Sequence, residues 1–161
     1  MTLPYRPNVG AVVFDRRGQV FVARRADLPN AERATSGWQL PQGGIDADED
    51  PRVAVLRELE EEIGTAHAEI IGEHADWLTY DLPPELIGHA LGGRYRGQRQ
   101  RWFALRFIGQ DSDIRLDLDP HPEFNAWRWT PLPELPGLAA PFKRPIYETL
   151  VRSFQRFATP L

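Results

Sequence analysis

The sequence predicts an α+β domain, a mixed β-sheet with a helix on each side. Residues 9–14 and 20–23 form two continuous apolar runs, and the polar, glycine-containing segment between them is typical of a hairpin turn. Residues 51–63 carry helix signals at both ends, and 145–157 close the chain with an apolar stripe at helical spacing. A chain of 161 residues fits one domain spanning 1–161.

The segments between these elements follow the same reasoning. Residues 25–37 are polar and contain a Pro-Asn pair, so we expect a loop there, followed by a short strand at 38–40. Apolar, strand-like residues predict the later strands, and prolines predict turns between them. The expected strands are 69–71, 77–80, 100–108 and 126–129, and the expected turns are 82–84 and 131–136.

The two predicted helices differ in character. Asp50 suits an N-cap, Pro51 suits the first helical position, and Gly64 suits a left-handed residue that ends the first helix. On the closing helix, one stripe carries the apolar residues Ile146, Leu150, Phe154 and Phe157.

Composition excludes several classes of protein. The chain has no cysteine, so disulfides, thiol nucleophiles and zinc–thiolate sites are excluded. No apolar run approaches the roughly 20 residues that span a bilayer, and the N-terminal residues lack the apolar core of a signal peptide. We therefore expect a cytoplasmic protein with no membrane partner. The net charge of −4 argues against binding long stretches of nucleic acid such as DNA, but not against holding an RNA by its end.

The first helix carries an unusual acidic run. Successive helical residues turn by about 100°, so Glu58, Glu61 and Glu62 share one edge while Glu60 points to solvent. Like charges one turn apart cost about 0.2–0.5 kcal/mol per pair, and a hard divalent cation such as Mg²⁺, Mn²⁺ or Ca²⁺ removes that cost. Arg57 lies one turn before Glu61, where it can orient that carboxylate. The adjoining face is apolar and should pack on the sheet: Val55, Leu56, Leu59 and Ile63.

A Glu run by itself is more often a solvated helix face, so the residues before it decide the interpretation. Gly43 is followed after five residues by Glu49, and after seven more by Arg57-Glu58-Leu59, then Glu61-Glu62 and Gly64. Seven fixed identities should match by chance in fewer than about one chain of this length in a million. The pattern over 43–65 is identified as the signature of the Nudix family, with Thr65 where an aliphatic residue is usual.

This resemblance implies a Nudix fold, an α/β/α sandwich with a mixed, curved β-sheet, and hydrolysis of phosphoanhydride bonds in nucleoside diphosphate-linked substrates. It implies that more than one Mg²⁺ ion, or Mn²⁺ or another divalent cation, binds at the motif. Either Glu61 or Glu62 could accept the proton of the attacking water. By resemblance, the metal ligands are Gly43, Glu58, Glu61 and Glu62, supported by Glu49 and Arg57.

Sequence segments outside the motif resemble one particular group of enzymes within this family. Residues 5–10, 97–103, 122–129 and 142–144 together look like the bacterial RNA pyrophosphohydrolases, which act in mRNA decay and overlap in sequence with diadenosine tetraphosphate hydrolases. The likeness implies that Glu123 is a further metal ligand. It also implies that Arg6, Arg25 and Lys143 contact phosphates or stack on a base. The polar loop before residue 38 is longer than in these relatives.

Composition and position add to these assignments. Lys143 is the one lysine among 19 basic residues, which suggests that a compact ammonium is needed there. Tyr80 and Phe142 could stack on a nucleobase or simply pack in the core. Residues 94–101 could form a basic rim for an RNA end or a solubilising loop. Three tryptophans in strands are expected in the core: Trp102, Trp127 and Trp129.

Three hypotheses for function follow. The first is an RNA 5′ pyrophosphohydrolase that removes phosphates from 5′-triphosphate or diphosphate RNA and leaves a 5′-monophosphate. The second is a hydrolase of dinucleoside polyphosphates such as diadenosine tetraphosphate. The third is a nucleotide-binding module without catalysis, which is disfavoured because all three motif carboxylates are present.

Overall fold

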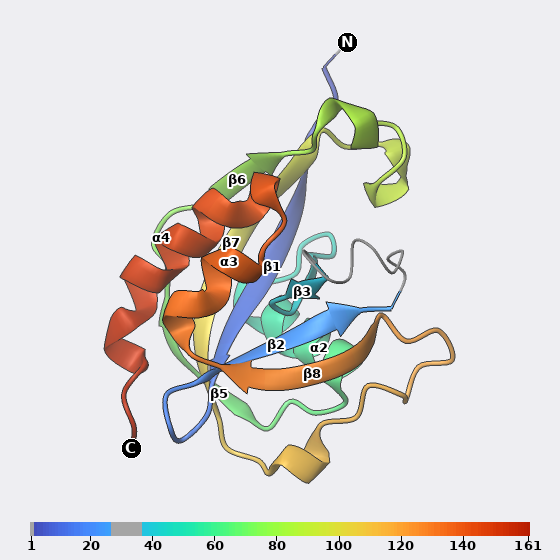
Figure 1. Ribbon diagram of the computed structural model, residues 1–161. Helices are drawn as coiled ribbons and strands as arrows, with labels where there is room; N and C mark the ends of the chain where they lie inside the picture. Colours follow the sequence, from blue (N-terminus) through green and yellow to red (C-terminus); the bar gives the residue numbers. More distant parts are fainter. Residues whose placement is uncertain (1, 27–36) are drawn as a thin grey trace.

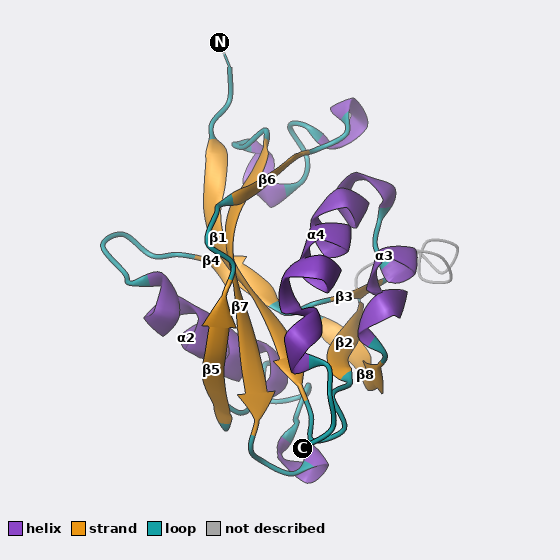
Figure 2. Cartoon of the chain, turned by 90° about the vertical axis from the view of Figure 1, so that its left-hand side faces the viewer, coloured by secondary structure: helices purple, strands orange, loops and turns teal. Residues whose placement is uncertain are grey.

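The computed structural model describes residues 2–26 and 37–161. Within them, one mixed sheet lies between helix α2 (Pro51–Ile63) and, on the other face, helices α3 (Leu135–Leu138) and α4 (Arg144–Phe154) (Figures 1 and 2). This arrangement is the α+β sandwich that the sequence predicts. No helix in these residues is long and apolar enough to cross a membrane.

The sheet is built around two long central strands. β1 and β7 run parallel to each other, and the remaining pairs are antiparallel, so the sheet is mixed as expected. Its main order is β3-β2-β1-β7-β5, with β4 added to β1, β6 to β7 and β8 to β2. The strands are β1 (Tyr5–Phe14), β2 (Val20–Arg25), β3 (Trp38–Gln39), β4 (Gln42–Gly44), β5 (Ala68–Glu73), β6 (Leu78–Asp81), β7 (Gly97–Phe107) and β8 (Phe124–Thr130).

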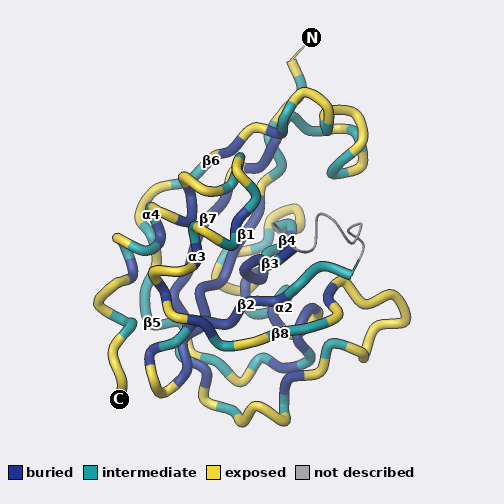
Figure 3. The backbone as a smooth tube through the Cα atoms, in the orientation of Figure 1, coloured by how far each residue is buried: buried dark blue, intermediate teal, exposed yellow. Residues whose placement is uncertain are grey.

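Alternation along β1 divides the core between the two faces of the sheet. Val9 and Val13 pack with the apolar stripe of α2, which includes Leu59. Val12 and Phe14 pack with residues of α3 and α4. Both sets are fully buried, and Figure 3 shows the buried backbone running through the centre of the sheet. The apolar stripe of α2 is therefore held against one face of the sheet.

The ends of α2 are set by local chemistry, as predicted. The Asp50 side chain accepts a hydrogen bond from Arg52 N at 2.7 Å, and Pro51 occupies the first helical position. Gly64 adopts a left-handed conformation with φ of 83°, and its N–H donates to Glu60 O. The predicted position of this helix is confirmed.

Several expected boundaries differ from the structure because tertiary pairing decides them. β1 begins at Tyr5, four residues before the apolar run, because its polar start pairs with the start of β7. β4 forms at two glycines that have no strand preference, since β1 supplies its partner. A short helix, α3, replaces part of the expected proline-rich turn. The closing helix ends at Phe154, and a 3-10 turn continues to Phe157.

Candidate active site

Helix α2 presents its glutamates as its periodicity predicts. Glu62 is buried, Glu58 is partly buried and Glu61 is exposed at the same edge of the helix. Glu60 is exposed and does not line the cavity that the other three glutamates share. The apolar residues beside these glutamates fix the edge by packing on the sheet.

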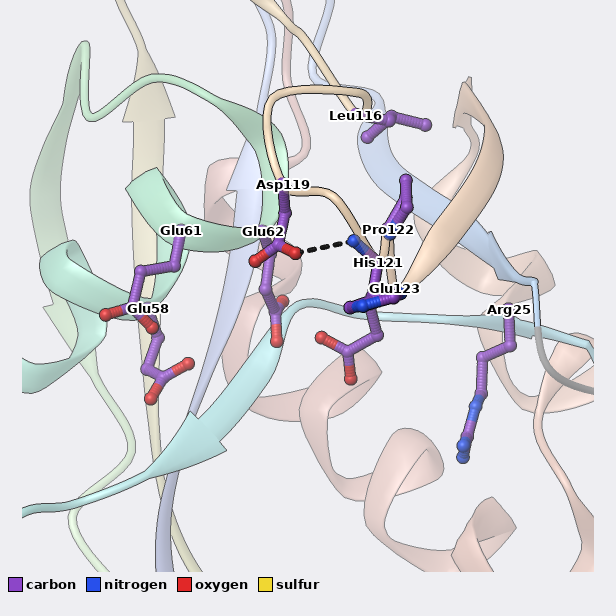
Figure 4. Close-up of a pocket in the computed structure, with 9 residues that line it drawn as sticks. All are labelled: Arg25, Glu58, Glu61, Glu62, Leu116, Asp119, His121, Pro122 and Glu123. Carbon is purple, nitrogen blue, oxygen red and sulfur yellow. Dashed lines mark hydrogen bonds between the residues drawn. The ribbon is translucent and has the colours of Figure 1, made fainter.

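The three glutamates open into a cavity of about 500 Å³. Glu123, which immediately precedes β8, reaches the cavity from the opposite side, and its backbone carbonyl accepts from Ala26 N at 2.9 Å. Figure 4 shows Glu62 and Glu123 pointing toward one another, with Glu58 and Glu61 side by side. The remaining lining residues are Arg25, Leu116, Asp119, His121 and Pro122. We call this the acidic cavity.

Glu62 is the most strongly perturbed carboxyl in this cavity. Burial raises its pKa well above the usual value, and the neighbouring Glu123 and Glu58 raise it further. One hydrogen bond opposes these effects, because Gln42 N donates to Glu62 Oε2 at 3.1 Å. A buried carboxylate beside like charges, with one backbone donor, is costly unless positive charge compensates it.

Arg57 organises the other side of the cavity. Its guanidinium donates two hydrogen bonds of 2.8 Å to Glu49 and one of 2.9 Å to Gly44 O. It also donates to Glu58 at 2.9 Å and, more loosely, to Glu61 at 3.3 Å. The hydrogen bonds from Arg57, together with one from Asp46 N, lower the pKa of Glu49 to about 2. Arg57 thus ties the loop before α2 to the glutamates of the helix.

Gly43 leaves room for the Glu58 side chain. A methyl group on Gly43 would lie 2.6 Å from Glu58 Cγ and closer still to its carboxylate. A residue larger than glycine at position 43 would therefore displace the Glu58 side chain from its present position. Burial raises the pKa of Glu58, and Arg57 partly opposes that effect.

The donor set fits a hard divalent cation. Carboxylates from Glu58, Glu61, Glu62 and Glu123 line one cavity, and oxygen ligands are those that Mg²⁺ prefers. In residues 2–26 and 37–161, however, no three His, Cys, Asp or Glu side chains already converge as a metal site. Arg57 is hydrogen-bonded to both Glu58 and Glu61, so these long side chains must rotate before the carboxylates can converge on a cation.

The basic residues predicted to contact substrate lie around this cavity. Arg6 lies near Glu58, and Arg25 lines the acidic cavity itself. Lys143 lies close enough to Arg25, Glu62 and Glu123 for their charges to affect it. Burial and Arg25 lower the pKa of Lys143 to about 8, while the two glutamates oppose the shift. The part of the long polar loop at residues 27–36 falls outside the described residues.

The two aromatic candidates have different environments. Tyr80 is only 6% exposed, accepts a hydrogen bond from Gln98 and belongs to the core, which favours the packing alternative for it. Phe142 is partly exposed, packs against Tyr80 in a tilted arrangement with 5.5 Å between ring centres, and lines a second cavity of about 620 Å³. Lys143 and Arg25 line that cavity as well, and we call it the apolar cavity.

The basic rim expected at 94–101 includes the start of strand β7, which begins at Gly97. Three of its four arginines make contacts within the protein. Arg96 pairs with Asp81 at 2.8 Å, Arg99 lies over the Trp77 ring at 4.2 Å, and Arg101 pairs with Glu73. Residues 94–96 lie in the loop before β7, and both the basic rim and the solubilising loop stay predictions. Trp102 is buried, and Trp127 and Trp129 pack partly buried against the core, as predicted.

Sequence reasoning missed a group of buried amides beside the carboxylates: Asn8, Gln39, Gln98 and Gln100. The first two and Gln98 line a smaller cavity of about 240 Å³, which also includes Glu58, Glu62 and Glu123. The alternation of glutamines at 98 and 100, leading to Trp102, was the available signal, since alternate residues of a strand share one face.

Comparison with known proteins identifies the family. The sequence matches the NUDIX domain over residues 4–150. The chain belongs to the Nudix family. This Nudix domain is 64% identical over 160 residues to a protein from Gluconacetobacter diazotrophicus named RNA pyrophosphohydrolase, covering 98% of this chain and 96% of that protein. A Rhodospirillum rubrum protein of the same name is 58% identical over 158 residues, covering 98% and 92%.

Solved structures agree on the fold. The Escherichia coli dihydroneopterin triphosphate pyrophosphohydrolase matches with a TM-score of 0.65 at 19% identity, covering 93% of this chain and 99% of that one. A binary complex of the Caenorhabditis elegans Ap4A hydrolase matches with a TM-score of 0.63 at 19% identity, covering 93% and 96%. The predicted family and the predicted Nudix sandwich are both confirmed.

Proposed function

We propose that this Nudix domain is an RNA 5′ pyrophosphohydrolase that converts 5′-triphosphate or diphosphate RNA to 5′-monophosphate RNA. One observation carries the proposal: Arg25 lines both the acidic cavity and the apolar cavity. Phosphates held in the acidic cavity would therefore extend toward a nucleotide at Phe142 and Lys143. The names of the relatives with 64% and 58% identity support the same substrate. The enzyme would act in mRNA decay in the cytoplasm.

Mg²⁺ is the cation that we propose, with Mn²⁺ as the alternative and more than one ion per site. Its ligands would be Glu58, Glu61, Glu62, Glu123 and the Gly43 carbonyl. When bound, it would neutralise the phosphates and lower the pKa of a water molecule. Residues of the chain itself would position the loop and helix, bind the phosphates and the base, and accept the proton.

The supporting roles follow from the contacts. Arg57 and Glu49 would fix the loop and helix relative to each other, because they share two short hydrogen bonds. Arg6 and Arg25 would bind phosphate oxygens as permanent positive charges, and Lys143 would do so while its ammonium is protonated. Phe142 would stack on a base, with Tyr80 behind it.

Two glutamates remain candidates for the base that accepts the water proton. Glu61 is exposed and weakly held, and Glu62 is buried with a raised pKa. The variants Glu61→Gln and Glu62→Gln distinguish them. The variant that removes the base should lose the acidic limb of the pH–kcat profile and still bind Mg²⁺. The variant that removes only a metal ligand should bind Mg²⁺ more weakly.

The substrate is tested by comparing Mg²⁺-dependent turnover of 5′-triphosphate RNA and of diadenosine tetraphosphate at matched concentrations. We expect the larger kcat/KM for RNA, with a 5′-monophosphate end as product. A far larger value for the dinucleotide would identify the second hypothesis instead, and binding of both without turnover would identify a non-catalytic module.

The metal assignment has a matched control on the same helix. Glu61→Gln should lower activity by orders of magnitude, whereas Glu60→Gln, which removes the same charge from the exposed face, should leave it near wild type. Full activity in the Glu61 variant would overturn the assignment.

A further inference from the structure

A polar stripe runs along one face of the two central strands. The parallel register of β1 and β7 places Arg6 opposite Gln98 and Asn8 opposite Gln100. Arg6 Nη1 donates to Gln98 Oε1 at 3.3 Å, and Gln100 Nε2 donates to Asn8 Oδ1 at 2.9 Å. The same face continues to Trp102, which is buried in the core. The stripe ends at the 240 Å³ cavity, which is lined by Arg6, Asn8 and Gln98.

Hydrogen bonding fixes which way the amides point. The indole N–H of Trp102 can only donate, and it donates to Gln100 Oε1 at 3.2 Å. Gln100 Nε2 must therefore point the other way, where it also donates to Gln42 Oε1 at 2.7 Å. Asn8 consequently presents Oδ1 to Gln100 and turns its Nδ2 away from it.

That nitrogen has no hydrogen-bond partner. Asn8 is 1% exposed, and across residues 2–26 and 37–161 its Nδ2 is the one buried side-chain polar atom left unsatisfied. Leaving a buried donor unpaired costs stability, so native proteins rarely retain one without a use. Asn8 lines the 240 Å³ cavity together with Glu58 and Glu62, so a molecule bound beside these carboxylates would be placed to supply the missing acceptor.

We propose, building on the proposed function, that Asn8 Nδ2 donates a hydrogen bond to a non-bridging oxygen of the substrate's 5′ phosphoryl chain. The cavity favours a phosphate over a base because Arg6 supplies a positive charge there and the aromatic Phe142 lies in the other, apolar cavity. Asn8 would then be a substrate-binding residue outside the Nudix motif, oriented by Gln100.

Asn8→Leu tests the assignment because it keeps the side-chain volume and removes both polar atoms. Gln100 Nε2 keeps one N–H bonded to Gln42, while its other N–H loses the Asn8 acceptor. The measurement is calorimetric affinity for a dinucleotide with a non-hydrolysable 5′-imidotriphosphate, in parallel with the same dinucleotide carrying a 5′-hydroxyl. We expect triphosphate affinity to fall about ten- to hundredfold, as for a lost hydrogen bond to a charged acceptor, with 5′-hydroxyl affinity unchanged. The Tm of the variant reports separately the cost of the unpaired Gln100 N–H.

A second variant guards against misfolding. Asn8→Asp keeps the shape and the oxygen that Gln100 contacts, but replaces the donor with an acceptor, so triphosphate affinity should fall at least as far. Wild-type triphosphate affinity in either folded variant, or an equal loss for both dinucleotides, would overturn the inference. If the wild-type protein itself neither binds nor hydrolyses the 5′-triphosphate, the proposed function fails instead.

Discussion

Gly43→Ala should separate activity from stability. The φ angle of Gly43 is not in the left-handed region, so the backbone accepts alanine without strain. The added methyl would lie 2.0 Å from the carboxyl carbon of Glu58, whereas carbon atoms pack at about 3.5–4.0 Å, so the carboxylate must move by roughly 1.5–2 Å. Glu58 can swing aside, and the free energy of unfolding should change by less than about 1 kcal/mol.

The cost should fall on catalysis. A misplacement of about 1 Å at a reacting centre can lower the rate by about 10²-fold. We expect kcat/KM for 5′-triphosphate RNA to fall by about that factor and the Mg²⁺ concentration for half-maximal activity to rise. The backbone carbonyl of residue 43 is retained in this variant, so the loss would report the position of Glu58.

Gly64→Ala is the matched control. Gly64 has a φ of 83°, and a methyl there would lie 2.7 Å from Arg115 O, a backbone atom that cannot move aside cheaply. This variant should lose about 1–3 kcal/mol of stability and keep its Mg²⁺ dependence at temperatures where it is folded. Urea denaturation and Mg²⁺ titration of activity measure both. Wild-type kcat/KM and Mg²⁺ dependence in a stably folded Gly43→Ala protein would refute the reasoning.

The remaining predictions concern three contacts. Because Lys143 has a pKa of about 8, it loses its charge above that pH, and the KM of the wild-type protein should rise there. In Lys143→Met, KM should be high and nearly constant across the same pH range. Steady-state assays measure both. Arg57 lowers the pKa of Glu49 from 4.5 to about 2, so their pairing stabilises the fold above about pH 4.5 and is lost as the pH falls toward 2. In Arg57→Lys, Tm should be lower at neutral pH and should fall less on acidification. An unchanged Tm–pH curve would contradict this. Tyr147→Phe removes the acceptor of Leu40 N, a bond of 3.0 Å in the core, and should cost about 1–3 kcal/mol by urea denaturation; no loss would mean that Leu40 N finds another partner.

The features that the sequence predicted well depend on neighbours along the chain. Asp50 and Gly64 set the ends of α2 through hydrogen bonds within a few residues. The shared edge of Glu58, Glu61 and Glu62 follows from helical rotation alone. The pairing of Arg57 with Glu61 is likewise an i,i+4 contact. Local geometry of this kind is already contained in the spacing of residues.

The missed features depend on residues far apart in the chain. Strand β4 exists because β1 pairs with it, and the bond between Asn8 and Gln100 joins residues 92 positions apart. The burial that raises the pKa of Glu62 and its approach to Glu123 also require the folded sheet. Family resemblance pointed to Glu123, but residue spacing could not.

The sequence by itself determined the Nudix motif, the helix that carries it and the edge on which its glutamates lie, since each follows from short-range geometry. Only the tertiary structure decided what faces those glutamates: Glu123 across the acidic cavity, Arg25 between two cavities, and an unpaired Asn8 amide beside them. The physical reason is strand register, because it brings together side chains from distant segments and fixes which of their polar atoms are left without a partner.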